Sequence, residues 1–204
     1  EFFEDPIDPE VEYSVRNAIE LLGKLGAKVH EISWPMYHPS KAISSTILMA
    51  EATAYHSQLI QMHGSHIDPQ VRLRLEAGFF ISGVDYIQAQ RARRLFYHHS
   101  ADLLKKVDLL AGPTVPITAC KIGTREVKIG ETRMGVIPAL TQYTRPFNLN
   151  GFPAITVPCG FSKEGLPIGL QLAGRPFDEE TALRVAHAYE QATEWHKKRP
   201  MISK

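Results

Sequence analysis

The chain has 204 residues, of which 44% are hydrophobic and 9% aromatic, and its formal net charge is +1. This composition argues against disorder and predicts one globular unit with a sizeable core. The sequence contains no concentrated basic run and no stretch of roughly 20 apolar residues, so it favours neither a nucleic-acid-binding nor a membrane protein. The two cysteines, Cys120 and Cys159, are too few for a disulfide framework, and a cytoplasmic location is expected.

The first predicted element is an amphipathic helix. Apolar residues recur at intervals of three and four from Val11 to Leu25. Asp8 is suited to the N-cap, Pro9 to the first helical position and Gly26 to the position just beyond the end. A helix over these residues is therefore expected.

A short strand and three further helices are expected next. Alternation of apolar and polar residues over 29–34 suggests a strand that ends before a proline. Residues 39–61 are rich in Ala, Ile, Leu and Met without a helix breaker, and 69–81 and 84–106 also have helical character. The first half of the chain is thus predicted to be mainly helical.

Three apolar runs predict the strands of a sheet. Residues 108–111 form a short run that is closed by a Gly-Pro-Thr-Val-Pro loop, a type of position where α/β proteins often bind ligands. Residues 154–161 and 167–173 are β-branched runs that flank a turn sequence, so they are expected to pair antiparallel. The predicted fold class is α/β, with a mixed β-sheet flanked by helices on both faces and these strands central to it.

Between and after these strands, the sequence predicts an excursion and two helices. Residues 120–133 mix Gly, Thr and charged residues and are expected to form an exposed excursion. Residues 136–149 are expected to form a helix despite Pro138 and Pro146. Asp178 is expected to cap a final helix.

No self-sufficient catalytic motif occurs in the sequence. Gly-x-Ser-x-Gly, Ser-x-x-Lys, His-Glu-x-x-His and the phosphate- and dinucleotide-binding glycine motifs are all absent. His56, His63 and His66 have a spacing that could bring imidazoles together, but no Asp, Glu or Cys at ligand spacing completes a metal site apart from Asp68. A solvated helix end is the preferred interpretation, and neither a metal nor a cofactor is predicted.

Two long motifs carry a resemblance to a known family. The first is Asn-Leu-Asn-Gly-Phe-Pro-Ala-Ile-Thr-Val-Pro-Cys-Gly-Phe at 148–161, and the second is Gly-Leu-Pro-Ile-Gly-Leu-Gln-Leu-Ala-Gly-Arg-Pro-Phe-Asp-Glu at 165–179. Together with Asp-Leu-Leu-Ala-Gly-Pro-Thr-Val-Pro at 108–116, they resemble the C-terminal half of the amidase-signature family. The resemblance covers essentially all 204 residues, except for the excursion near 121–133.

The resemblance implies that the catalytic residues are not in this chain. Family members hydrolyse carboxamides with a nucleophilic serine, a second serine and a lysine, and all three belong to the half that would precede Glu1. The chain begins without a methionine, so residues 1–204 are interpreted as the C-terminal portion of one domain. Alone, this portion is expected to be inactive because it lacks the nucleophile, the base and the oxyanion donors.

Four residues are candidates for contact with a substrate. The resemblance suggests that Arg74 grips a substrate carboxylate, as the matching arginine does in the transfer-RNA-dependent amidotransferase branch; a structural ion pair is the alternative. Thr114 follows a predicted strand and could face a bound acyl group, but a proline-fixed turn explains it equally well. Gln142 and Thr144 can hydrogen-bond to an amide or a carboxylate. Thr141 stands where the amidotransferase branch has an aspartate, which counts against glutamine as the substrate.

Three functions follow as alternatives. The leading one is a cytoplasmic amidase acting on a small carboxamide, completed by the N-terminal half of the same enzyme. The second is the A subunit of a glutamyl- or aspartyl-transfer-RNA amidotransferase, which would need partner subunits but would not itself bind nucleic acid. The third is a non-catalytic fragment or scaffold. An incomplete sheet with an open edge also predicts that the isolated chain self-associates into a homo-oligomer.

Overall fold

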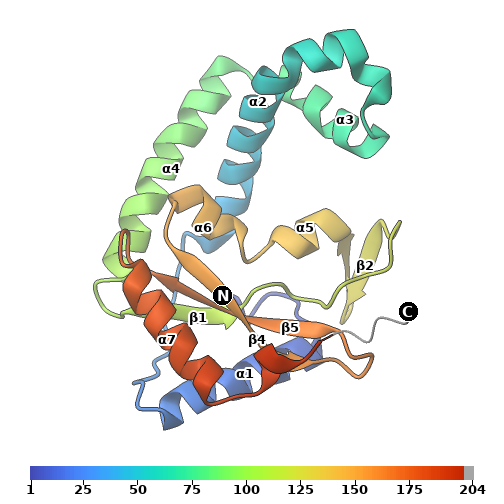
Figure 1. Ribbon diagram of the computed structural model, residues 1–204. Helices are drawn as coiled ribbons and strands as arrows, with labels where there is room; N and C mark the ends of the chain where they lie inside the picture. The colour runs from blue at the N-terminus through green and yellow to red at the C-terminus, as the bar shows by residue number, and fades with distance from the viewer. Residues whose placement is uncertain (200–204) are drawn as a thin grey trace. The chain divides into compact units, whose positions relative to one another are not determined.

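The computed structural model describes residues 1–199, which form two compact units (Figure 1). The first contains residues 1–35 together with the chain from residue 101 onward and is called the sheet unit. The second contains residues 36–100 and is called the helical unit. No helix in the described part of the chain combines the length and the apolar character needed to cross a membrane.

The sheet unit is built on three strands. They are β1 (Leu109–Pro113), β4 (Ala154–Phe161) and β5 (Pro167–Gly174), in the order β1-β5-β4. Both pairs are antiparallel, and β4 has an irregularity between Pro158 and Gly160. The three predicted strands and the antiparallel pairing of the last two are therefore confirmed.

Two helices cover one face of this sheet, α1 (Pro9–Lys24) and α7 (Glu179–Gln191). Both begin as predicted: a carboxylate oxygen of Asp8 accepts from the Glu10 N–H at 2.8 Å, and Asp178 accepts from the Thr181 N–H at 3.4 Å. The apolar side chains of the two helices and of β4 and β5 form the main core, which comprises Val11, Val15, Ala18, Leu22, Val157, Cys159, Ile168, Leu170, Leu172, Ala186 and Tyr189.

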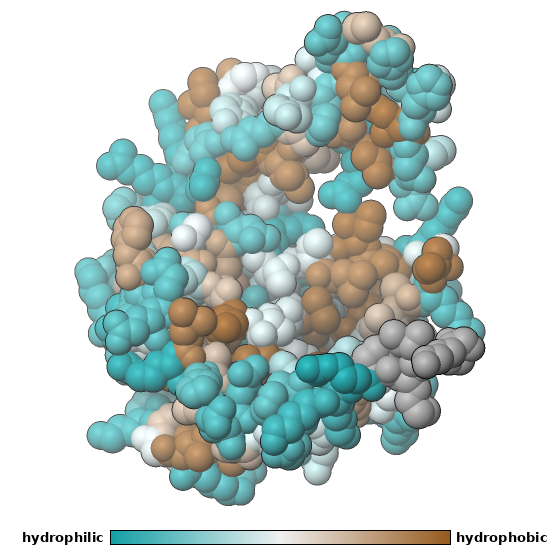
Figure 2. Space-filling view, viewed as in Figure 1, coloured by the Kyte–Doolittle hydropathy of each residue, from teal (hydrophilic) through white to brown (hydrophobic). Residues whose placement is uncertain are grey.

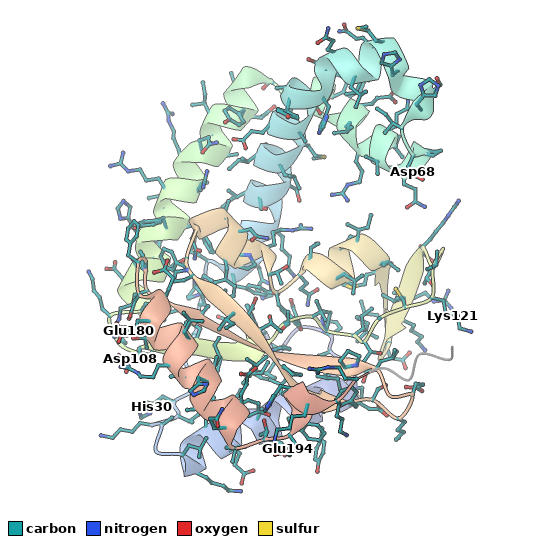
Figure 3. All side chains as sticks on the ribbon, viewed as in Figure 1. His30, Asp68, Asp108, Lys121, Glu180 and Glu194 are labelled. Atoms are coloured by element: carbon teal, nitrogen blue, oxygen red, sulfur yellow. The ribbon has the colours of Figure 1, made fainter. Side chains whose placement is uncertain are left out.

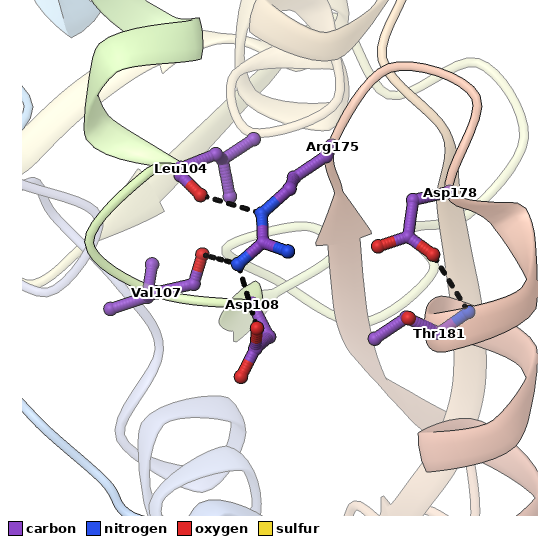
Figure 4. A network of polar contacts seen from close by, with 6 residues as sticks. All are labelled: Leu104, Val107, Asp108, Arg175, Asp178 and Thr181. Carbon is purple, nitrogen blue, oxygen red and sulfur yellow. Dashed lines mark hydrogen bonds and ion pairs between the residues drawn. The ribbon is translucent and has the colours of Figure 1, made fainter.

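An arginine fixes the chain just before β1. Arg175 donates through Nε to the Leu104 carbonyl at 2.8 Å and through Nη2 to the Val107 carbonyl at 3.2 Å (Figure 4). Its Nη2 also lies 2.7 Å from a carboxylate oxygen of Asp108. Arg175 belongs to the second family-like motif, and these bonds hold the connection that enters β1 in place.

The predicted helix over 136–149 is wrong in one respect, because it is two helices. These are α5 (Val136–Thr141) and α6 (Arg145–Asn150). Pro146 has no N–H to donate to the preceding turn, and a proline disfavours helical geometry in the residue before it. The chain therefore bends at residues 142–144, and Pro146 occupies the first turn of α6.

The predicted exposed excursion is also wrong in part. It contains a hairpin formed by β2 (Glu126–Ile129) and β3 (Thr132–Gly135). Gly130 adopts a φ of 58° at the turn, a conformation that glycine reaches without steric cost. Ile129 is 3% exposed and packs in a small cluster with Ile117 and Ala139, so the hairpin has a core of its own.

The strand predicted over residues 29–34 does not form. The segment is irregular, and the backbone N–H of Trp34 donates to the Glu1 carboxylate at 2.8 Å rather than to another strand. The Trp34 ring lies in an aromatic cluster with Phe2 and Phe147. Trp34 is the only buried residue of this segment and Val29 is 52% exposed, so the apolar alternation does not mark one face of a strand.

The helical unit contains three long elements and two short ones. They are α2 (Tyr37–His63), η1 (Gly64–His66), α3 (Pro69–Ala77), η2 (Gly78–Phe80) and α4 (Gly83–Leu103), whose last three residues belong to the sheet unit. The helical character predicted for this region is confirmed. The α2 helix packs on α3 and η2, where a Cβ at Gly78 would lie only 2.4 Å from the Met49 carbonyl oxygen. Large apolar side chains are exposed on this unit (Figure 2), namely Leu48, Tyr55, Leu59, Met62, Val71, Leu73, Phe79, Phe80, Val84, Ile87 and Leu95.

Candidate functional site

The face of the sheet opposite α1 and α7 is polar and lined by small residues. Successive β5 residues alternate between faces, so Ile168, Leu170 and Leu172 enter the core while Gly169 and Gln171 face the other way. This second surface is called the polar face. It is the part of the sheet unit that can offer hydrogen bonds to a ligand.

Two threonines meet on the polar face. The Oγ1 atoms of Thr114 and Thr156 are 3.1 Å apart, and the Thr114 N–H donates to the Gly169 carbonyl at 3.1 Å. A Cβ at Gly169 would lie 2.7 Å from Thr156 Cγ2 and 2.8 Å from Thr114 Oγ1, which is closer than real contacts allow. Glycine at 169 therefore makes room for the threonine pair. Thr114 lies at the end of β1, as predicted, whereas Thr156 was not predicted.

The bend between α5 and α6 is tied to the same face. The Nε2 atom of Gln171, which is 4% exposed, donates to the Tyr143 carbonyl at 3.2 Å. This bond satisfies a buried carbonyl that the break between the two helices leaves outside helical pairing. It also fixes the position of the two flanking candidates, Gln142 and Thr144.

Gln142 is the most unusual polar group of the site. Its side chain is 3% exposed, and among the described residues its Nε2 atom makes no hydrogen bond of standard geometry, although it lies near the Tyr143 hydroxyl. Burial raises the pKa of the neighbouring Tyr143 hydroxyl, an effect that the nearby Gln142 amide partly opposes. A buried N–H that lacks an acceptor costs about 1–3 kcal/mol. Such a group is available to a ligand carbonyl or carboxylate.

Thr144 is held more loosely. Its Oγ1 lies 3.5 Å from the Thr141 carbonyl, at the limit of a hydrogen bond. Next to it, Arg145 donates from Nη2 to the Thr141 hydroxyl at 2.5 Å, and that hydroxyl donates to the Ile137 carbonyl at 2.8 Å. Arg145 was not predicted as a site residue, although it is the only charged residue between Gly135 and Phe161.

Arg74 lies in the helical unit, on α3. Its side chain is exposed and makes no ion pair with any residue that the structure describes, so the structural ion pair offered as an alternative is absent there. The ion pair on this helix belongs to Arg72, whose Nε lies 2.6 Å from a Glu76 carboxylate oxygen. The role of Arg74 as a carboxylate ligand stays a prediction.

The histidines do not form a metal site within residues 1–199. The rings of His63 and His66 are 5.9 Å apart, but no group of three or more His, Cys, Asp or Glu side chains is placed to hold an ion there. Asp68 instead caps α3 by accepting from the Gln70 N–H at 2.9 Å (Figure 3). The polar face thus offers hydroxyl and amide groups that can hydrogen-bond to a ligand, but none of the groups described above is a nucleophile paired with a base.

The family follows from comparison with known proteins. The Amidase family model matches residues 1–183, so the chain belongs to the Amidase family. The chain is 39% identical over 203 residues to an amidase from Pseudomonas putida, a match that covers 98% of this chain and 43% of that protein. It is 37% identical over 227 residues to the A subunit of glutamyl-tRNA(Gln) amidotransferase from Chloroflexus aurantiacus. This match covers 99% of this chain and 45% of that protein.

Solved structures agree with this assignment. One amidase structure matches with a TM-score of 0.85 and 29% identity over 94% of this chain and 43% of that chain. The glutamyl-tRNA(Gln) amidotransferase A subunit from Thermotoga maritima matches with a TM-score of 0.73 and 32% identity over 94% and 41%. The predicted fold class is therefore confirmed, and the chain spans less than half of the length of these relatives.

Proposed function

We propose that this chain is the C-terminal portion of an amidase that hydrolyses a small carboxamide through a serine acyl-enzyme. The observation that carries the proposal is the 39% identity to the Pseudomonas putida amidase across 98% of this chain, while less than half of that protein is covered. The nucleophile, the base and the oxyanion donors are assigned to the portion that this chain does not contain. The chain alone is then inactive.

In this proposal, the polar face and the adjoining bend contribute to the wall of the substrate pocket. Gln142 donates its buried N–H to the substrate carbonyl or to a carboxylate nearby, a better-aligned acceptor than any that the described residues provide. Thr114 and Thr144 offer hydroxyl groups that can donate or accept. For Arg74, we propose that its exposed guanidinium forms a bidentate pair with a carboxylate.

A second candidate function is that of an amidotransferase A subunit. Identity of 37% to one such protein across 99% of this chain favours it. Against it stands Thr141, whose hydroxyl is bonded to Arg145, so the position carries a neutral group beside a cation. A substrate ammonium group, as in glutamine, would be repelled there, whereas a carbonyl or a carboxylate would be accepted.

Complementation tests the proposal. The 204-residue chain is assayed for hydrolysis of propionamide and of glutamine, alone and after co-expression with the N-terminal portion of the Pseudomonas putida relative. We expect no turnover by the chain alone and turnover of propionamide, but not of glutamine, by the co-purified pair. Turnover by the isolated chain, or none by a co-purified and folded pair, would contradict the amidase assignment. A preference for glutamine would support the second candidate.

Variants of the active pair test the pocket assignment. Gln142→Leu is expected to lower kcat/KM by about tenfold to a hundredfold, since it removes one hydrogen bond to the substrate and leaves a polar group unpaired. Gln90→Leu, on α4, removes a partly exposed amide that bonds to Tyr86 and serves as the matched control. Equal losses in both variants would argue against a substrate contact by Gln142.

A further inference from the structure

A groove of about 810 Å³ lies on the helix-covered side of the sheet unit, away from the polar face. Its walls are α1 and the segment that runs from α7 into η3 (Trp195–Lys197), and the end of β4 contributes Cys159 and Phe161. The volume falls in the range of about 300–1,000 Å³ that is typical of small-molecule sites. All lining residues belong to the sheet unit, and they include Tyr13, Cys159, Phe161, Tyr189, Trp195 and Lys198.

The inner part of the groove is apolar and electrically neutral. Cys159 is 4% exposed, and burial raises the pKa of its thiol to about 12. Tyr189 is 1% exposed, and burial raises the pKa of its hydroxyl to about 12 as well. Both groups therefore stay uncharged at neutral pH. Phe161 and Trp195, with ring centroids 6.1 Å apart, add aromatic surface suited to an aliphatic or aromatic tail.

The charged groups of the lining leave one cation without an anion. Lys163 Nζ lies 3.4 Å from a Glu10 carboxylate oxygen, and Glu194 (Figure 3) lies 2.8 Å from Nζ of Lys197, which is outside the lining. Lys198 Nζ lies 4.9 Å from the ring centroids of both Phe161 and Trp195. Within residues 1–199 no carboxylate lies within ion-pair distance of Lys198. The groove thus combines neutral apolar walls with one uncompensated positive charge.

We propose that this groove binds a small molecule with an apolar tail and a single carboxylate. The tail would lie over Cys159 and between Tyr13 and Trp195, where it removes apolar surface from water. The carboxylate would pair with Lys198, whose ammonium group is already held over two aromatic rings. This site is separate from the proposed amidase pocket and does not depend on that function.

Tryptophan fluorescence provides a direct test with the full 204-residue chain. The chain has two tryptophans, and Trp34 is 6% exposed, so a ligand in the groove should alter mainly the emission of Trp195. Octanoate is titrated as the probe, and 1-octanol serves as its uncharged counterpart. We expect saturable binding of octanoate that is about fivefold tighter than that of 1-octanol, as one ion pair with the exposed Lys198 would give.

Two substitutions separate charge from packing. Lys198→Met keeps an apolar stem over the rings and is expected to weaken octanoate about fivefold while leaving 1-octanol unchanged. Lys28→Met is the matched control, because this exposed lysine is outside the groove lining and forms no ion pair with a lining residue. No saturable binding of octanoate, or equal binding of acid and alcohol, would overturn the proposal. A change of Trp195 emission with protein concentration alone would indicate a second copy as the occupant and would also overturn it.

Discussion

At the scale of single residues, Gly169 controls the geometry of the polar face. Gly169→Ala would bring its Cβ to within 3 Å of Thr114 and Thr156, so the threonine pair must move. We expect the free energy of unfolding to fall by about 1–3 kcal/mol, as overpacking usually costs. Urea denaturation followed by circular dichroism measures this loss. Gly83→Ala, where no atom lies within 4 Å of the new Cβ, is the control and should cost nothing.

Buried Cys159 predicts a pH dependence of stability. Its pKa in the folded chain is raised to about 12 by burial, above the usual value near 9, so the unfolded chain releases its proton first as pH rises. This contribution to stability is complete below pH 9 and is lost as pH rises towards 12. The slope is at most about 1.4 kcal/mol per pH unit for one group.

Comparison of two cysteine variants isolates this effect. Cys159→Ala should show a shallower loss of unfolding free energy between about pH 8 and 10 than the unsubstituted chain, whatever its stability at neutral pH. Cys120→Ala, which removes a partly exposed thiol, should keep the original slope. Identical slopes in both variants would show that Cys159 does not titrate differently in the folded and unfolded chains.

At the scale of secondary-structure elements, the N-cap of α1 contributes a measurable part of the free energy of unfolding. Asp8→Ala removes the carboxylate that accepts from the Glu10 N–H, and a lost N-cap costs about 1 kcal/mol. Asp8→Asn keeps an oxygen acceptor and should recover most of the loss. If alanine and asparagine destabilise equally in urea denaturation, the hydrogen bond is not what stabilises this helix end.

Elements with local signals were predictable from the sequence, and elements that depend on distant contacts were not. Helix α1 was predicted because its cap, its apolar spacing and its first-turn proline are all local signals. The strand expected over residues 29–34 failed because Trp34 is its only buried residue, and the aromatic rings that Trp34 contacts belong to the distant residues Phe2 and Phe147, which no local pattern reveals. The β2–β3 hairpin was missed although Gly130 marks its turn, because the charged residues around it masked a single buried isoleucine.

The candidate site was predictable only in part for the same reason. Thr114 was found because it ends a strand, and Gln142 because it lies on the approach to Pro146. Thr156 was not found, because its relation to Thr114 arises from sheet register across 42 residues. The poorly satisfied amide of Gln142 also could not be foreseen, since its lack of a well-aligned acceptor among the described residues depends on packing around the bend.

At the scale of the whole molecule, the two faces of the sheet have different roles: one packs in the core, and the other offers hydrogen-bonding groups. One face carries the apolar residues that pack on α1 and α7, and these supply the main core. The other is lined by glycine, threonine and glutamine, which contribute little apolar burial but can bond to a ligand. Gln142 is outside the main core, so Gln142→Leu leaves the packing of α1 and α7 on the sheet unchanged.

The small size of the sheet leads to the last prediction. Strands β1 and β4 are its two edges, and each has an unpaired side among the described residues. Exposed edges tend to pair with another chain, whereas a lysine on the edge opposes such pairing. We therefore expect the isolated chain to self-associate with increasing concentration in sedimentation velocity, and Ala154→Lys, at an exposed position of β4, to reduce this association. Ala77→Lys, at the exposed end of α3, adds the same charge to the helical unit without changing a strand edge and should leave association unchanged. A chain that stays monomeric at high concentration would show that its edges are protected without a partner.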